Sequence, residues 1–170
     1  KKNNKVWISE SNNKKRKLRY TLQIIEVNGK KVGVNTHLTN KIVLEGLKKN
    51  LIPFFSKKVQ IKPEQKFGQN TRFDFLLNDN NKKSFLEVKN VTLVREKSLA
   101  EFPDAITERG KKHLHELVNS LDKGYNAYIL FVVQREDCNS FKIANDIDRE
   151  YKYVFDKALK SGVKVLCYDC

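Results

Sequence analysis

Asp74, Glu87 and Lys89 are the residues of this chain whose types and spacing are best suited to catalysis. Asp74 and the Glu87-Val88-Lys89 tripeptide lie in two strand-like segments, separated by a polar stretch that contains Asn80-Asn81. If those two asparagines form a two-residue hairpin turn, Asp74 faces Glu87 directly across an antiparallel pair. Lys89 lies two residues further along, on the same face of its strand. The spacing therefore predicts one cluster of two carboxylates and an amine.

Such a cluster suits metal-assisted hydrolysis. Two adjacent carboxylates repel each other, but they are the ligands that a hard cation such as Mg²⁺ or Mn²⁺ binds. A neighbouring lysine can hold or deprotonate an attacking water, or offset charge in a phosphorane-like transition state. The alternative is an exposed hairpin in which Lys89 forms a salt bridge of little net energy. The apolar setting favours a buried cluster, since the neighbours are Phe73, Phe75, Leu76, Phe85, Leu86 and Val88.

The elements around this hairpin alternate between strand and helix. Asn28-Gly29 predicts a second hairpin near the N-terminus, and Gly162 predicts the end of a late helix. Strand, helix, strand, helix, strand is the order of an α/β domain. We expect strands at Val6–Ser9, Tyr20–Val27, Lys31–Asn35, Thr71–Leu77, Ser84–Val94, Ala127–Val133 and Val163–Tyr168. We expect helices from Thr36 to about Asn50, over Leu114–Leu121, and from about Asp148.

Several ordered segments of the chain carry a resemblance to a known family. Asp74 followed after a hairpin by Glu-x-Lys resembles the PD-(D/E)XK signature of restriction-endonuclease-like domains. Together the segments resemble the sugar fermentation stimulation protein family of bacteria and archaea, from about Tyr20 to Cys170. They are Arg72-Phe73-Asp74-Phe75-Leu76-Leu77, Glu87-Val88-Lys89-Asn90-Val91-Thr92-Leu93, Phe102-Pro103-Asp104-Ala105, Thr107-Glu108-Arg109-Gly110, Lys112-His113-Leu114 and Phe131-Val132-Val133-Gln134-Arg135.

This resemblance implies an α/β fold: a restriction-endonuclease-like mixed sheet flanked by helices over 36–170, preceded at 1–35 by the C-terminal strands of a partial OB-fold. It implies DNA as the partner, with a link to the regulation of maltose metabolism. Asp74, Glu87 and the Val88 carbonyl would bind Mg²⁺ or Mn²⁺, and Lys89 would assist phosphodiester hydrolysis. The alternative is a non-catalytic DNA-binding regulator that retains the nuclease fold.

Two further residues are candidates for the site because of this resemblance. In nuclease domains of this type a glutamate on the first helix often joins the metal site, and Glu45 is the candidate here. A glutamate exposed at the helix edge, beside Lys41 and Lys49, is the alternative. Gln134 lies where such domains place a polar residue beside the site, and a hydrogen-bonding role at a strand end is its alternative.

The charge of the chain favours a polyanionic partner. The net charge is +14 and the pI is near 9.7, and cations that neutralise phosphates release condensed counterions. A bias toward Lys and Asn codons is the alternative, since 27 of the 34 cations are Lys. That alternative leaves a structural or protein-interaction module as a third interpretation. Candidate DNA contacts are Arg72 and the basic loop residues Lys14, Lys15 and Arg16, although a mobile solvated loop is also typical there.

The start of the helix after Pro103 offers two more cations. Arg109 and Lys112 are three residues apart, on the face opposite the apolar stripe, where they can contact DNA backbone. Asp104 or Thr107 is the candidate helix cap. His113 and His115 point in different directions on a helix and do not form a metal pair, so we expect ordinary surface or core-edge histidines.

The remaining features bound the class of protein. The apolar runs are too short to cross a membrane and the start lacks a secretory signal, so we expect no membrane partner and a cytoplasmic location. Cys138, Cys167 and Cys170 are then expected to be reduced. Zinc binding at the CxxC is disfavoured, because a structural zinc needs four ligands and only Cys138 and the histidines remain to complete the set. The chain starts at Lys1 without Met, so we expect an upstream segment. The oligomeric state stays open, and a homodimer is compatible with the sequence.

Overall fold

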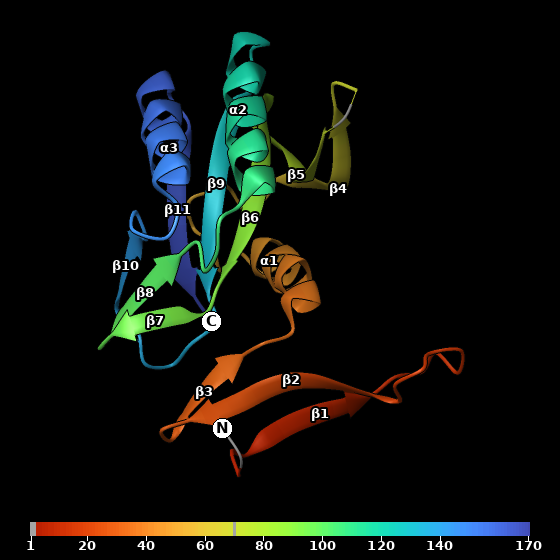
Figure 1. Cartoon of the computed structure of the whole chain (residues 1–170). Helices are drawn as coiled ribbons and strands as arrows, with labels where there is room; N and C mark the ends of the chain where they lie inside the picture. The colour runs from red at the N-terminus through yellow and green to blue at the C-terminus, as the bar shows by residue number, and fades with distance from the viewer. Residues whose placement is uncertain (1–2, 70) are drawn as a thin grey trace.

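The computed structural model describes residues 3–69 and 71–170, and within them it has three sheets and three α-helices (Figure 1). The N-terminal sheet is an antiparallel meander of β1 (Val6–Glu10), β2 (Tyr20–Val27) and β3 (Lys30–Gly33). Asn28 and Gly29 both have positive φ, 52° and 75°, as a type I′ turn requires. The hairpin predicted at Asn28-Gly29 is therefore confirmed.

A five-stranded mixed sheet forms the centre of the larger part of the molecule. Its strand order is β11-β9-β6-β5-β4. The first three of these strands are mutually parallel, and β5 and β4 complete the sheet in antiparallel fashion. The strand bounds are β4 Gln60–Phe67, β5 Thr71–Asp79, β6 Lys82–Val91, β9 Asn126–Val133 and β11 Lys164–Asp169.

Helices cover both faces of this sheet and create two apolar cores. α2 (Glu108–Asp122) and α3 (Arg149–Ser161) cover one face, where Leu114 and Leu117 are fully buried. A 3₁₀ turn, η1 (Thr36–Leu38), leads into α1 (Thr39–Lys48), which covers the other face. The burial of β9 on both faces explains its uninterrupted apolar sequence. None of the helices in the described residues is long and apolar enough to span a membrane.

A second small sheet lies beside the C-terminal end of β6. It consists of β7 (Leu93–Glu96), β8 (Leu99–Phe102) and β10 (Ser140–Ile143), in the order β10-β8-β7. Arg95 holds it together, because its guanidinium donates to both carboxylate oxygens of the fully buried Glu101, at 2.7 and 2.8 Å. The predicted strand Ser84–Val94 is therefore two strands, which are separated at Thr92.

The predicted fold class is confirmed, and three strands escaped prediction. β8 and β10 have four residues each, too few to show a period. β4 is mostly polar and contains Pro63, which argues against a central strand. It is tolerated here because β4 lies at the edge of the sheet. The predicted helix from Thr36 begins as the 3₁₀ turn and becomes α-helical only at Thr39.

Main-chain bonds join the N-terminal sheet to the end of β9. The Gly33 N–H donates to the Gln134 carbonyl at 2.9 Å, and Val32 forms an isolated bridge with Arg135. The Gln134 side chain is buried and donates to Thr39 Oγ1 at 2.9 Å. Gln134 therefore forms hydrogen bonds at the strand end, and a role for it in catalysis stays a prediction.

Gly33 is the residue whose substitution tests this junction. A Cβ at Gly33 would lie 2.6 Å from Gln134 Oε1 and 3.1 Å from Gln134 Cβ. We expect Gly33→Ala to lower the free energy of unfolding in urea by about 1–3 kcal/mol, because the buried glutamine must move. Gly46→Ala is the control: its nearest neighbour lies at 3.6 Å, so a helix interior gains about 0.4–1 kcal/mol. Equal stability of Gly33→Ala and the wild type would contradict the tight junction.

Candidate active site

Asp74 lies where β5 separates from β6. The two strands pair from Asp79 opposite Lys82 to Phe75 opposite Leu86, in the register that the Asn80-Asn81 turn predicts. The ladder ends one pair before Asp74 and Glu87, so these two residues are not paired as strand neighbours. β6 meanwhile continues to pair with β9 as far as Val91. A fork between two strands therefore opens at Asp74.

The geometry of β5 changes sharply at this fork. Phe73 packs in the core under α2 and α3, whereas Phe75 packs in the core under α1, although alternation would place both on one face. The pairing of β4 with β5 also skips Asp74 and its counterpart Glu64, which has a positive φ of 50°. Asp74 therefore lies at an irregular point of the strand, the kind of place that often borders functional sites.

Contacts from two other elements hold the Asp74 carboxylate. Asn40 of α1 donates to Oδ1 at 2.6 Å, and the main-chain N–H of Val88 donates to Oδ2 at 2.8 Å. Burial raises the pKa of Asp74 above its ordinary value, and the negative charge of Glu87 adds to the rise. The hydrogen bonds from Val88 and Asn40 only partly offset these effects. Asp74 is thus a carboxylate whose charge lacks a sufficient counter-charge.

Glu87 is the most deeply buried charge of the cluster, with 3% of its surface exposed. Its Oε1 accepts a bond from Lys89 Nζ at 2.7 Å and contacts His113 Nδ1. Burial by itself would raise the pKa of Glu87, but the hydrogen bond from His113 and the charge of Lys89 outweigh it. The pKa of Glu87 therefore lies below its ordinary value, and the two carboxylates differ in their tendency to ionise.

His113 is the site residue that sequence reasoning missed. It lies on the inner face of α2 with 7% of its surface exposed, where a core-edge histidine was expected. Its Nε2 lies 3.5 Å from Arg109 Nε, and Lys89 Nζ lies 3.5 Å from its Nδ1. The contact of Nδ1 with the Glu87 carboxylate and that of Nε2 with the Arg109 donor assign the tautomer with the proton on Nδ1, which donates to Glu87. The available signal was its position one residue before Leu114, at the edge of the apolar stripe.

The structure separates Glu45 from this cluster. Glu45 is 61% exposed and forms an ion pair with Lys49 at 2.5 Å. Asn40, five residues earlier on α1, is the residue of that helix that bonds to Asp74. Five residues correspond to more than one turn of helix, so the two side chains leave α1 on different sides. A role for Glu45 in the site stays a prediction that none of its contacts supports.

The predicted cations lie at different distances from the fork. Arg109 is exposed and contacts His113 of the cluster, and Arg72 is ion-paired with Glu64 at 3.1 Å. The loop with Lys14, Lys15 and Arg16 projects away from the central sheet, at the far end of the β1–β2 hairpin (Figure 1). Lys112 is exposed on the outer face of α2.

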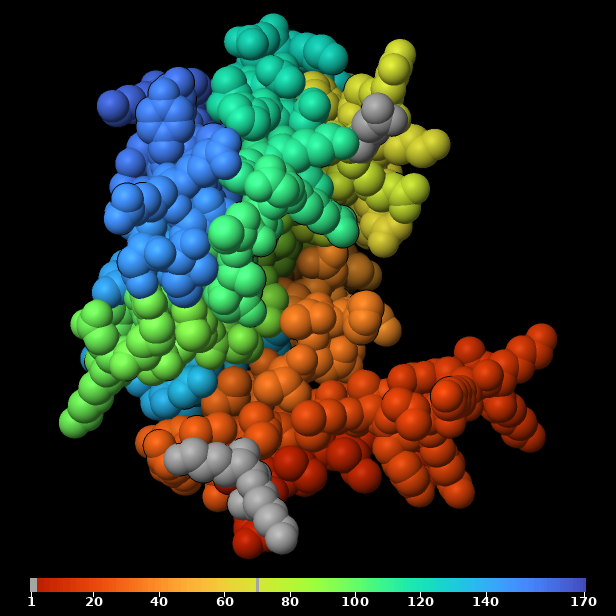
Figure 2. Space-filling view, viewed as in Figure 1, coloured from red at the N-terminus to blue at the C-terminus, as the bar shows by residue number. Residues whose placement is uncertain are grey.

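Figure 2 shows the surface around the fork from the side of α1 and α2. Strand atoms are recessed between α1, in orange, and the first turns of α2, in green. The side chain of Lys89 is 12% exposed. The cluster is thus covered by two helices but not sealed by them.

Comparison with known proteins identifies the family. Residues 37–170 match the family model described as the sugar fermentation stimulation protein RE domain, and residues 1–34 match the one described as the SfsA N-terminal OB domain. The chain belongs to the sugar fermentation stimulation protein family. The predicted recognition is confirmed, and so is the OB-fold assignment of the N-terminal strands. The division at residue 35 stays a prediction.

Members of this family from several bacteria are similar over nearly the whole chain. The sugar fermentation stimulation protein homolog of Pelagibacter ubique is 52% identical, over 98% of this chain and 72% of the relative. The homolog of Bartonella tribocorum is 46% identical, over 99% of this chain and 71% of the relative. Pyrococcus furiosus SfsA, solved in complex with Ca²⁺, is 27% identical with a TM-score of 0.87, covering 96% of this chain and 69% of that one.

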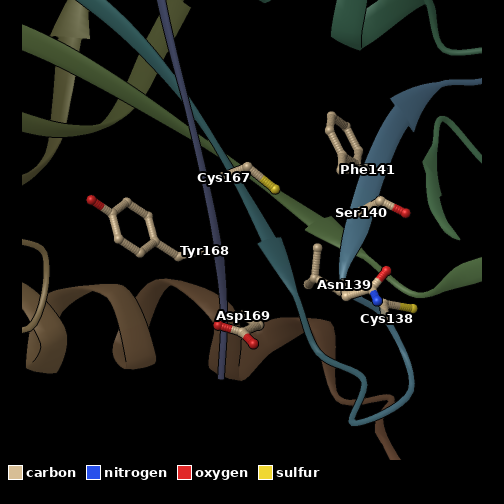
Figure 3. A pocket seen from close by; sticks show the side chains of 8 residues that line it. Cys138, Asn139, Ser140, Phe141, Cys167, Tyr168 and Asp169 are labelled. Atoms are coloured by element: carbon tan, nitrogen blue, oxygen red, sulfur yellow. The ribbon is translucent and has the colours of Figure 1, made fainter. Parts of the chain in front are cut away.

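The chain has three cysteines, Cys138, Cys167 and Cys170. All three are free thiols, and burial raises the pKa of each. Cys138 and Cys167 line one pocket of about 370 Å³, in which Cys167 points from β11 toward β10 (Figure 3). Tyr168 points to the opposite side of β11. The described residues contain no group of three or more His, Cys, Asp or Glu placed to hold a metal.

Neutralisation of Asp74 and neutralisation of Glu87 are expected to change the stability of the protein in opposite directions. A raised pKa means that folded Asp74 keeps a proton over a pH range where the unfolded chain has lost it, so stability falls as pH rises through that range. Asp74→Asn removes this loss. We expect it to raise the free energy of unfolding at pH 7 by about 0.5–2 kcal/mol, with no gain below about pH 3.

Glu87→Gln is expected to act in the other direction. It leaves the Lys89 ammonium buried without its counter-charge, which lowers stability by about 3–5 kcal/mol. Chemical denaturation of both variants at pH 7 without added metal measures the two effects. Glu45→Gln, in an exposed ion pair, serves as the control and is expected to change stability by less than about 1 kcal/mol. Destabilisation by Asp74→Asn would contradict the assignment of Asp74 as the strained carboxylate.

Proposed function

We propose that this protein binds DNA and hydrolyses its phosphodiester bonds with Mg²⁺ or Mn²⁺, through Asp74, Glu87 and Lys89. The observation that carries the proposal is the convergence of these three buried or partly buried groups at the fork between β5 and β6. Charged side chains are rarely buried unless they are paired, and burial together with the charge of Glu87 raises the pKa of Asp74 despite the nearby Lys89. Groups with perturbed pKa values are candidates for catalysis.

The donor set suits a hard divalent cation. Asp74 and Glu87 supply two carboxylates, and Mg²⁺ is commonly bound by one or two carboxylates with waters in the other positions. One oxygen of Glu87, Oε2, is buried without a hydrogen-bond partner. The binding of Ca²⁺ by the SfsA of Pyrococcus furiosus supports a divalent cation in this family. A cation between the two carboxylates would also remove the repulsion that raises the pKa of Asp74.

The Val88 carbonyl is the third proposed ligand. The N–H and C=O of one strand residue point to the same side of the strand. The Val88 N–H points toward β5, because it donates to Asp74. The carbonyl of Val88 therefore faces the open fork rather than β9. This orientation supports the Val88 carbonyl as a neutral oxygen ligand of the proposed cation.

The chemistry divides between the cation and the residues of the chain. The cation would polarise the phosphate and lower the pKa of a bound water. Lys89 is placed to hold that water or to offset negative charge on the phosphate oxygens, because its Nζ already lies 2.7 Å from Glu87 Oε1. Arg109 is exposed and lies beside His113, which supports a role for it in contacting the DNA backbone.

Cleavage assays test the catalytic proposal. Supercoiled, linear duplex and single-stranded DNA are incubated with the protein and Mg²⁺ or Mn²⁺. We expect cleavage that Asp74→Asn and Lys89→Ala each slow at least about a hundredfold, because each removes a group that acts on the transition state. Asp156→Asn, in an exposed pair on α3, is expected to cleave at the wild-type rate. Cutting that persists unchanged in both fork variants would refute the proposed site.

A second function, DNA binding without catalysis, is favoured by one observation. Lys89 and His113 both bind Oε1 of Glu87, so the lysine amine is paired rather than free to activate water. A DNA-binding regulator, with the proposed link to sugar metabolism, would keep such an arrangement for stability alone. Binding without cutting under any metal would favour this function.

DNA binding itself is tested through its dependence on salt. We expect Arg109→Ala to weaken duplex binding and to reduce the slope of log K against log salt by about 1, since one phosphate contact is lost. Replacing Lys14, Lys15 and Arg16 together by Ala is expected to reduce the slope by up to about 3. Lys152→Ala on α3 is the control, because Lys152 is already paired with Asp156. No binding at low salt would favour a structural or protein-interaction module.

A further inference from the structure

Two buried oxygen atoms behind the fork have no hydrogen-bond partner among the described residues. One is Oε2 of Glu87 and the other is the hydroxyl of Tyr151. Glu87 is 3% exposed and Tyr151 is completely buried. Buried polar atoms in proteins nearly always have a partner, and an ordered water commonly supplies it when no side chain does. Each of these two atoms therefore needs a partner that the side chains around it do not supply.

Tyr151 reaches this place from α3, across the start of α2. Its ring packs against Phe102 and Phe155, with centroids at 5.4 and 6.2 Å. Gly110 of α2 makes room for it, because a Cβ at Gly110 would lie 3.0 Å from Cε2 of the tyrosine ring. Gly110 is three residues before His113, so Tyr151 and His113 approach the strands from the same side.

The hydroxyl of Tyr151 lies within the electrostatic influence of Glu87. Burial raises the pKa of Tyr151, and the charges of Glu87 and Asp148 raise it further. Both oxygens of Asp148 already accept hydrogen bonds: Oδ1 accepts from the Tyr151 N–H at 2.8 Å and Oδ2 from the Thr107 N–H at 2.9 Å. Of these two carboxylates, Glu87 alone has an oxygen without a partner.

We propose that Tyr151 is a positioning residue that donates a hydrogen bond to Oε2 of Glu87 through one buried water. His113 and Lys89 hold Oε1, and the tyrosine-bound water holds Oε2. A carboxylate has about four lone-pair sites, and these three donors occupy three of them. One lone pair stays free to face the fork. Binding of a divalent cation by that lone pair rests on the proposed function.

The matched pair Tyr151→Phe and Tyr153→Phe tests this role. Both variants remove one hydroxyl from α3, but Tyr153 is 58% exposed. Removal of a buried hydroxyl that has no partner leaves stability unchanged or increases it. If the hydroxyl is bonded through water to Glu87, Tyr151→Phe is expected to lower the thermal midpoint by about 2–4 °C without metal. Tyr153→Phe is expected to melt with the wild type.

A spectroscopic measurement separates positioning from plain stability. The Nδ1 proton of His113, which is bonded to Glu87, is observed by NMR and assigned through His113→Gln. We expect its resonance to shift in Tyr151→Phe and to stay in place in Tyr153→Phe, because only the former frees the Glu87 carboxylate to rotate. An unchanged resonance, or a Tyr151→Phe midpoint at or above the wild-type value, would overturn the proposal.

Titration calorimetry with Mg²⁺ or Ca²⁺ alone then tests whether the positioning of Glu87 by Tyr151 affects metal binding. Loss of a group that orients a metal ligand commonly weakens affinity 10- to 100-fold, and we expect about tenfold for Tyr151→Phe. Equal affinities of the wild type and Tyr151→Phe would overturn the role of Tyr151 in the metal site. No binding by the wild type would refute the proposed function, while the midpoint and the NMR resonance would still decide the hydrogen bond.

Discussion

Beyond Leu86, β6 has a strand partner on one side only, because β9 stays paired with it while β5 turns away. Main-chain groups on the open side must then bond to something else, since unpaired buried N–H groups are costly. The Val88 N–H meets this need by donating to Asp74. The departure of β5 thus brings a carboxylate next to the main chain of β6, at the place where we propose that a cation binds. Each proposal for the site depends on this fork.

The charges at the fork are tolerated because of the helices on either side. α1 contributes Asn40 to Asp74, and α2 contributes His113 to Glu87. Without these donors two carboxylates and one ammonium would be buried with few partners, which proteins avoid. The compensation is uneven, since the pKa of Glu87 is lowered and that of Asp74 is raised. A site that is electrostatically unsatisfied in this way costs stability, and the proposed cation would offset that cost.

Local patterns predicted the elements that have a strong period or a clear turn. The Asn80-Asn81 turn set the register of β5 and β6, because a two-residue hairpin leaves one pairing. The apolar run of β9 and the Gly162 terminus of α3 were equally readable. Short or polar strands such as β4 and β8 were not, because their pairing depends on neighbours that are distant in sequence. Phe73 and Phe75 pack on opposite faces of the sheet, although they are two residues apart, and the local sequence does not predict this change of face.

The sequence by itself determined the hairpin register and the placement of Lys89 beside Glu87, because these follow from turn chemistry and the two-residue period of a strand. It also indicated the family and the fold class, through a series of motifs that resemble those of the family and through the order of strands and helices. Only the tertiary structure decided which residues of other elements complete the cluster. Asn40 replaces Glu45 as the contact from α1, and His113 joins from α2. Those choices depend on how each helix is rotated against the sheet. That rotation is set by the packing of whole apolar faces, a property that no local stretch of sequence contains.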